Sequence, residues 1–180
     1  MPEVNEASVE ERELEEKGFS YKVVWEKVSE ELIEEARKFW VSEGALPEGA
    51  SGGSRANQLL GVIRDSEGGL AAVSTVEVVP VPALLNNLFY YFRCFVASNY
   101  RREGLMMELA DKAREYFCPL FLQGENSEVK GFYFSLENKG LESSMTDAVL
   151  LSGGLEHSFI GVDKKQRRLY VGWFDGATID

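Results

Sequence analysis

The chain has 180 residues, of which 44% are hydrophobic and 27% charged, and its formal net charge is −11. This length allows one well-buried core, and the composition is that of an ordinary globular protein. Two cysteines and one histidine make neither a disulfide framework nor a metal-binding cluster, so we expect a cytoplasmic protein without a metal. The acidic balance argues against a nucleic-acid partner, and no apolar run is long enough to cross a membrane.

The excess negative charge is concentrated near the N-terminus, where glutamates follow one another closely. We expect residues 1–18 to form an acidic extension and residues 19–180 to form one domain. The structural interpretation of the acidic run is a solvated helix that precedes the folded domain. The functional alternative is an electrostatic field that attracts cationic amines.

Strand and helix patterns alternate along the first part of the chain. The aromatic and β-branched run 21–28 predicts a strand, and Ser29 fits the N-cap of a helix that Gly44 ends. The Gly- and Ser-rich residues 47–54 predict a surface loop, with a mobile edge of a substrate cleft as the alternative. Three strand-like runs then follow without an intervening helix, at residues 58–64, 70–79 and 88–96.

The spacing of these runs fits an antiparallel meander better than a crossover unit. Apolar residues at helical spacing predict a helix from Leu105 to Phe117. Residues 141–151 fit either a strand or a loop. Beyond the helix we expect a short strand at 120–123, a helix at 126–138 and a final hairpin of residues 159–162 and 169–174. The pattern indicates an α/β (α+β) chain with a mixed, mostly antiparallel sheet flanked by helices.

The most informative segment runs from Phe95 to Phe117, where a buried strand leads through a tight turn into a helix. The first turn of a helix leaves backbone N–H groups without intrahelical partners and carries a partial positive charge. Phosphates bind readily there. Gly104 lets a phosphate approach the backbone, and Arg101 and Arg102 supply forked donors. The segment therefore predicts an anion site, with an ordinary helix start and surface arginines as the alternative.

This segment resembles the GNAT superfamily of acetyl-CoA-dependent N-acetyltransferases. That family places [Gln/Arg]-x-x-Gly-x-[Gly/Ala] between a central strand and a helix, and holds the CoA pyrophosphate with it. The string here is Arg101-Arg102-Glu103-Gly104-Leu105-Met106, in which Met106 departs from the small residue of the family. The strand segment Cys94-Phe95-Val96 matches the family segment whose backbone pairs with the pantetheine arm. The resemblance covers residues 21–140 in order of elements and implies a GNAT-like acyl-CoA N-acyltransferase fold.

A second match concerns an Asn followed seven residues later by a Tyr, which the family carries on the helix after its fifth strand. Asn126 and Tyr133 have this spacing, which implies a cofactor contact for Asn126 and a general-acid role for Tyr133. A phenol with a pKa near 10 is protonated at neutral pH and can donate to the departing CoA thiolate. The family Tyr usually stands four residues before a Gly, whereas Leu136 has that place before Gly140. The alternative for Tyr133 is core packing.

The sequence identifies no general base. Residues 88–96 contain no acid, and Glu77 in the preceding run stays outside the predicted site. Cys94 and Cys118 have no histidine nearby in the sequence, and a G-x-S-x-G motif is absent, so cysteine nucleophiles and hydrolase chemistry of that kind are disfavoured.

The resemblance implies direct transfer of an acetyl group from acetyl-CoA to an amine. We expect the acceptor to be a small-molecule or peptide amine of cationic character, and a homodimer is compatible with the sequence. One alternative is a non-catalytic CoA-binding or regulatory domain on the same scaffold. Another is an interaction module that no longer binds CoA. Met106, which stands where the family has a small residue, is compatible with this alternative.

Overall fold

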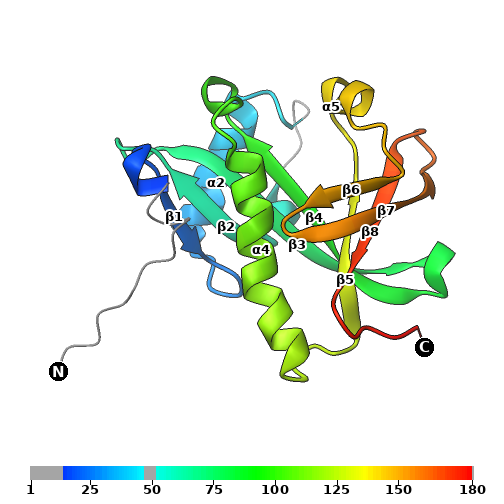
Figure 1. The fold of residues 1–180 in the computed structure, drawn as a ribbon. Coiled ribbons are helices and arrows are strands. Elements are labelled where there is room, and N and C mark those ends of the chain that lie inside the picture. Colours follow the sequence, from blue (N-terminus) through cyan, green and yellow to red (C-terminus); the bar gives the residue numbers. More distant parts are fainter. Residues whose placement is uncertain (1–13, 47–51, 180) are drawn as a thin grey trace. The chain divides into compact units, whose positions relative to one another are not determined.

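The computed structural model describes residues 14–46 and 52–179 (Figure 1). Within them, eight strands form one open sheet in the order β1-β2-β3-β4-β5-β8-β7-β6. β4 and β5 are parallel, whereas the described pairs β1–β2, β5–β8, β7–β8 and β6–β7 are antiparallel. The predicted α/β class with a mixed, mostly antiparallel sheet is therefore confirmed.

The internal contacts divide the chain into two compact units. Unit 1 comprises residues 1–74 and 94–106, and unit 2 comprises residues 75–93 and 107–180. The strands β3 (Leu70–Val81) and β4 (Asn87–Val96) and the helix α4 (Leu105–Leu122) each contribute residues to both units.

Unit 1 packs a capped helix against a buried strand. The side chain of Ser29 accepts a hydrogen bond from the Leu32 N–H at 3.3 Å and caps this helix, as the sequence predicts. Trp40 of the helix is fully buried and shares a core cluster with Leu59 and Val62 of the strand. The elements that lie wholly in this unit are β1 (Ser20–Val23), α2 (Glu30–Ser42), α3 (Gly53–Ala56), β2 (Leu59–Arg64) and the 3-10 turn Ser98–Tyr100.

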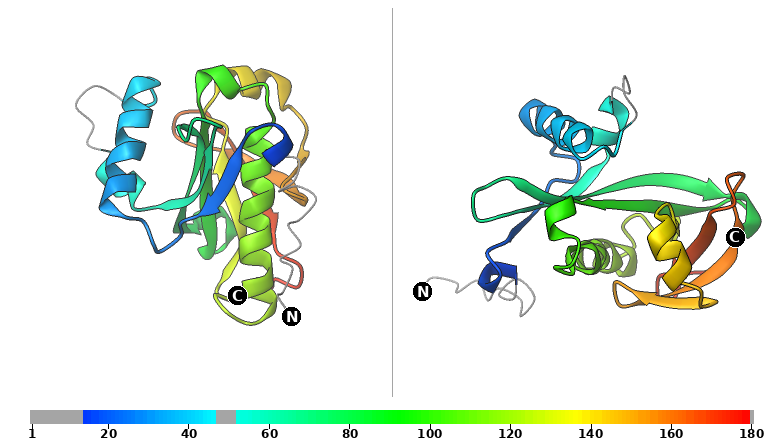
Figure 2. Two further views of the ribbon diagram at one scale, coloured as in Figure 1. Left: turned by 90° about the vertical axis from the view of Figure 1, so that its left-hand side faces the viewer. Right: turned by 90° about the horizontal axis from the view of Figure 1, so that it is seen from above.

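Unit 2 packs α4 on one face of β4 and β5 (Figure 2). Phe117 of α4 stacks on Tyr90 of β4 with 3.9 Å between ring centroids. Its ring centroid lies 6.0 Å from that of Phe132 of β5. Because strand side chains alternate between faces, Tyr91 and Tyr133 lie on the opposite face. The other elements of this unit are the 3-10 turn Pro82–Leu84, β5 (Val129–Ser135), α5 (Lys139–Ser144), β6 (Val149–Ser152), β7 (Leu155–Val162) and β8 (Arg168–Trp173).

The prediction of a strand at 120–123 is wrong, because these residues complete α4 and its C-terminal cap. Pro119 has no N–H and lies inside the helix, where it removes a hydrogen bond. The helix continues past it because Phe121 packs against Phe174, with 5.3 Å between ring centroids. Gly124, with a φ of 83°, then ends the helix.

The prediction of a helix at 126–138 is also wrong, because β5 occupies most of this segment. The run from Val129 to Ser135 is aromatic and β-branched and pairs with β4 on one side and β8 on the other. Such residues fit a sheet that is covered on both faces. Asn126 lies in the turn before the strand, with a φ of 54°.

The remaining differences are small. The first strand ends at Val23 rather than at residue 28, and the undecided residues 141–151 contain the end of α5 and most of β6. Of the predicted loop 47–54, residues 47–51 lie outside the described part, and α3 begins at Gly53. The domain boundary at residue 18 stays a prediction. The first helix, the three meander strands, the helix from Leu105 and the final hairpin are confirmed.

Gly131 offers a test of the β5–β8 pairing in unit 2. It lies opposite Trp173, and a Cβ at this position would overlap the carbonyl oxygen of Gly172. Gly131→Ala should lower the free energy of unfolding by about 3 kcal/mol, because the backbone of β8 must move. Chemical denaturation measures this loss. Gly53→Ala is the control, since a Cβ there meets no atom within 4 Å; equal midpoints for both variants would contradict the pairing.

Candidate functional site

In unit 1, β4 is followed by a short turn and then by α4, in the order predicted. β4 ends at Val96 and α4 begins at Leu105. Between them, residues 101–104 are exposed to solvent. Gly104 has a φ of 79°, in the left-handed region that favours glycine, and nothing lies within 4 Å of the position that a Cβ would take. The backbone at this turn is therefore open to a ligand.

The start of α4 has the properties of an anion site. The N–H groups of Gly104, Leu105 and Met106 precede or open the helix, so they have no intrahelical carbonyl to bind. Leu105 is buried and fixes the first turn of the helix. Arg101 and Arg102 are exposed, whereas Met106 is half-buried. A phosphate at this position would meet N–H donors, the positive end of the helix dipole and two guanidinium groups nearby.

The end of β4 supplies the predicted segment Cys94-Phe95-Val96, whose residues are all half-buried. Phe95 packs edge-on against Phe39 of α2, with 5.6 Å between ring centroids. Burial raises the pKa of the Cys94 thiol to about 12, although Arg55 acts in the opposite direction. The thiol is therefore protonated at neutral pH, which agrees with its exclusion as a nucleophile.

In unit 2, the parallel pairing of β4 with β5 ends before β5 does. The last described pair is Tyr91 with Tyr133, whereas β5 continues to Ser135 and pairs there with β8. The register of β4 also shifts between Leu88 and Tyr90, which indicates a bulge. We call the region beyond the last pair, formed by Phe92 and Phe134 next to Tyr91 and Tyr133, the fork.

A pocket opens at the fork on the face that carries α4. Its empty space of about 300 Å³ includes open solvent at the mouth, so it is an open recess and not an enclosed cavity of that size. Its wall is mostly apolar. The lining residues are Phe92, Ala110, Ala113, Phe132, Phe134, Ser152, Gly153, Leu155 and His157.

His157 is the one ionisable side chain in this lining. It is 4% exposed, and its Nδ1 lies 3.0 Å from the carbonyl oxygen of Leu155. Burial lowers its pKa, so the imidazole is neutral at pH 7. The wall of this pocket is therefore uncharged at neutral pH.

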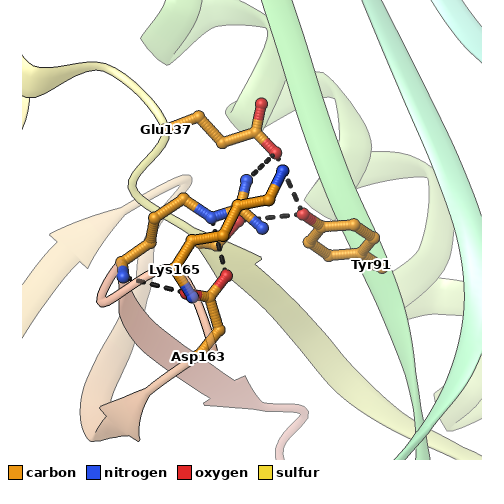
Figure 3. A network of polar contacts seen from close by, with 6 residues as sticks. Tyr91, Glu137, Asp163 and Lys165 are labelled. Atoms are coloured by element: carbon orange, nitrogen blue, oxygen red, sulfur yellow. Dashed lines mark hydrogen bonds and ion pairs between the residues drawn. The ribbon is translucent and has the colours of Figure 1, made fainter.

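The opposite face of the fork carries a polar network (Figure 3). The hydroxyls of Tyr91 and Ser135 are 2.9 Å apart, and Tyr91 also donates to Glu137 Oε1 at 3.3 Å. Arg167 binds the same Glu137 oxygen at 2.8 Å and Asp163 Oδ2 at 2.6 Å. Burial raises the pKa of Tyr91, so the phenol is protonated at neutral pH. The network connects Tyr91 of β4 with residues at the end of β5, after β7 and before β8.

Tyr133 lies on β5 and not on a helix, so the family pattern no longer supports its role. The helix that follows β5 is α5, whose N-cap is Asn138, and seven residues after it stands Met145. Asn126 precedes β5 in a turn after the C-terminal end of α4, whereas the anion turn precedes the N-terminal end. Asn126 and the anion turn belong to different units, and the cofactor contact of Asn126 stays a prediction.

The location of Tyr133 nevertheless gives it a possible chemical role of its own. It is half-buried, belongs to the last β4–β5 pair, and has its ring 5.3 Å from that of Tyr91. Burial raises its pKa, and among the described residues its hydroxyl has no hydrogen-bond partner. A protonated phenol in this state can donate to a ligand at the fork.

Sequence reasoning missed Tyr91, Glu137 and Arg167. The period-two pattern of β4 could have placed Tyr91 and Arg93 on one face, but no short motif connects them with residues 40 or more positions later. Glu77, which stays outside the predicted site, is paired with Arg93 at 3.8 Å. In the described ranges, no group of three or more His, Cys, Asp or Glu residues could hold a metal, and no helix is long and apolar enough to span a membrane.

Comparisons with known proteins support the fold. No protein-family model and no curated protein sequence matches the chain. Among solved structures, the ribosomal-protein-S5-alanine acetyltransferase from Vibrio fischeri is similar, with a TM-score of 0.52 and 9% identity over 89% of this chain and 96% of that one. A mutant AtaT toxin bound to the C-terminus of the antitoxin AtaR has a TM-score of 0.53 and 11% identity, over 86% and 92% of the two chains.

A GNAT-family acetyltransferase from Streptococcus pneumoniae gives a TM-score of 0.50 with 9% identity, over 86% of this chain and 96% of that one. At these identities the likeness concerns the fold and not the activity. The resemblance found in the sequence is thus confirmed for the architecture, and this chain has the fold of the GNAT acetyltransferases.

Proposed function

We propose that this chain binds acetyl-CoA and transfers its acetyl group to an amine. The observation that carries the proposal is the exposed turn between β4 and α4, with a left-handed glycine at the start of the helix. This arrangement suits the pyrophosphate of CoA, because backbone donors, helix dipole and arginines all favour an anion. The fold shared with acetyltransferases supports acetyl transfer as the class of chemistry.

The roles of the residues in unit 1 follow from their positions. The backbone N–H groups of residues 104–106 bind the pyrophosphate, and Arg101 and Arg102 add charge. Glu103 shapes the turn, because its N–H donates to the Tyr100 carbonyl at 3.1 Å and is therefore not left for the pyrophosphate. The segment Cys94–Val96 offers strand backbone to the amides of the pantetheine arm.

In unit 2, the fork provides the groups for chemistry. A cationic acceptor first loses one proton to water, because only the neutral amine has a free electron pair. Its nitrogen then attacks the thioester carbonyl carbon, the C–N bond forms and the C–S bond breaks. The Tyr133 hydroxyl gives its proton to the departing sulfur, the second amine proton passes to water, and water returns a proton to the Tyr133 phenolate. We assign no side chain as general base.

The acceptor that we propose is a cationic amine. The net charge of −11 attracts cations and repels anions before contact is made. In the polar network, the carboxylates of Glu137 and Asp163 already bind Arg167, and Lys165 belongs to the same network (Figure 3). The preference for a cation therefore rests on the net charge of the whole chain.

A non-catalytic CoA-binding domain is the second candidate. Two observations favour it: Met106 stands in the phosphate turn where the family has a small residue, and Met145 stands seven residues after Asn138 on the helix that follows β5. Met106 leaves the backbone N–H donors of the turn in place. Met145 has no hydroxyl at the position where the family has its Tyr, which leaves Tyr133 as the candidate acid.

The phosphate turn is tested by Gly104→Val. A β-branched side chain strains the left-handed backbone by about 1–2 kcal/mol and enters the space needed by the phosphate. We expect the variant to fold but to lose the thermal stabilisation by acetyl-CoA, which amounts to about 2.7 kcal/mol at 100 times Kd.

The matched control is Gly124→Val. Gly124 also has a positive φ, of 83°, and nothing lies within 4 Å of the position of its Cβ, but it follows the C-terminal end of α4. Its melting temperature should fall to a similar extent, while its response to acetyl-CoA stays that of the parent protein. A full response of Gly104→Val would show that the phosphate site lies elsewhere.

The acid role is tested by Tyr133→Phe. Loss of the hydroxyl should lower kcat by about 10²- to 10⁴-fold, because general acid assistance contributes such factors. The Kd for acetyl-CoA should stay unchanged, since the ring remains. Tyr91→Phe is the comparison, because its hydroxyl is already engaged by Ser135 and Glu137. Unchanged turnover in Tyr133→Phe, or a larger loss in Tyr91→Phe, would refute the assignment.

A further inference from the structure

Two carboxylates in unit 1 bind the connection that leads from β4 to the phosphate turn. Glu43 Oε2 accepts the backbone N–H of Ser98 at 2.8 Å. Asp65 Oδ2 accepts the hydroxyl of Tyr100 at 2.9 Å. Ser98 and Tyr100 are the ends of the 3-10 turn that directly precedes Arg101. The connection is therefore held at both ends by side chains from other parts of unit 1.

Each carboxylate is itself attached to ordered backbone. Asp65 lies in the β2–β3 turn, where its other oxygen accepts the N–H groups of Glu67 at 3.0 Å and Gly69 at 2.9 Å. Glu43 is the C-cap of α2, and its N–H donates to the Phe39 carbonyl at 3.1 Å. The carboxylate of Asp65 is thus fixed by the turn, and that of Glu43 extends from a residue with an ordered backbone.

Tyr100 transmits this support to the phosphate turn. Its ring packs edge-on against Phe19, with 5.3 Å between centroids, so the side chain is fixed at both the ring and the hydroxyl. Its N–H donates to Ala97 at 2.9 Å, and its carbonyl accepts the N–H of Glu103 at 3.1 Å. The hydroxyl bond to Asp65 thus fixes a residue whose backbone shapes the turn up to Glu103.

We propose that Asp65 and Glu43 are positioning residues for the anion site at the start of α4. This inference rests on the proposed binding of CoA. Residues 101–104 are exposed and have little packing of their own, whereas backbone donors hold a phosphate only when their geometry is fixed within about 0.5 Å. The two carboxylates supply that order from outside the turn.

The test uses the whole chain and two ligands, acetyl-CoA and S-acetylpantetheine, which has the same thioester but no phosphate. Tyr100→Phe removes the bond to Asp65 and keeps the ring, and Glu43→Ala removes the bond to Ser98. Each change should weaken acetyl-CoA binding about three- to tenfold, the factor that corresponds to one hydrogen bond. The affinity for S-acetylpantetheine should not change, and combining the changes should weaken acetyl-CoA binding further.

Tyr170→Phe in unit 2 is the matched control. It also removes a tyrosine hydrogen bond of 2.9 Å, from the hydroxyl to the Asp147 carbonyl, so it reports the effect of lost stability alone. It should lower the melting temperature without changing either affinity. Amide hydrogen exchange gives a readout without ligand: residues 98–104 should exchange faster in Tyr100→Phe and at the parent rate in Tyr170→Phe.

The outcomes separate the inference from the function on which it rests. If the parent protein binds no acetyl-CoA, both are overturned. If the parent binds it and Tyr100→Phe binds it equally well, only the positioning role is overturned. Equal weakening for both ligands would overturn that role too, because it would indicate a general disturbance of unit 1.

Discussion

The candidate site depends on the need of backbone N–H groups for partners at the start of α4. An α-helix leaves its first N–H groups without intrahelical acceptors, and the helix dipole makes them good donors to an anion. Gly104 keeps the approach open, since it has no side chain and adopts a φ of 79°. The connection before this exposed turn is attached to the rest of unit 1 by two hydrogen bonds, in which Glu43 accepts the Ser98 N–H and Asp65 accepts the Tyr100 hydroxyl. In our account, local sequence and tertiary contacts together determine the geometry of the backbone N–H groups at the start of α4.

The fork in unit 2 is a second constraint, imposed by strand pairing. Parallel β4 and β5 pair up to Tyr91 and Tyr133, after which β5 continues beside β8 alone. The end of the ladder separates two surfaces of different chemistry. An apolar pocket with a neutral histidine lies on the α4 face, and a network around Tyr91 and Glu137 lies on the other. The polar face, which also carries Tyr133, is the one on which we propose the chemistry.

The sequence predicted the order of strand, turn and helix around Gly104, because the signals for this order are local. Gly104 and the apolar spacing from Leu105 onward mark the helix start without reference to distant residues. The same local reasoning failed at Tyr133, because an alternating aromatic run fits a strand or a helix, and neighbouring strands decide between them. It also failed at Pro119, which suggests a helix end but is tolerated where Phe121 packs on Phe174.

The polar network could not be predicted, because Tyr91, Ser135 and Arg167 come from three different strands or their ends. Their meeting follows from the sheet order, in which β5 lies between β4 and β8. The support from Asp65 to Tyr100 is of the same kind, since 35 residues separate the two partners. Sequence patterns reveal elements and turns, whereas such contacts arise only when the strands assemble.

The central claim is that this chain transfers an acetyl group, and the most direct measurement is the mass of the products. The protein would be incubated with acetyl-CoA and a mixture of cationic, neutral and anionic amines, at low and at high salt. The account predicts enzyme-dependent N-acetylation that favours cationic amines, with a rate that falls as salt screens the attraction. Binding of acetyl-CoA without acetylation of any amine would contradict this claim and leave a CoA-binding domain as the function.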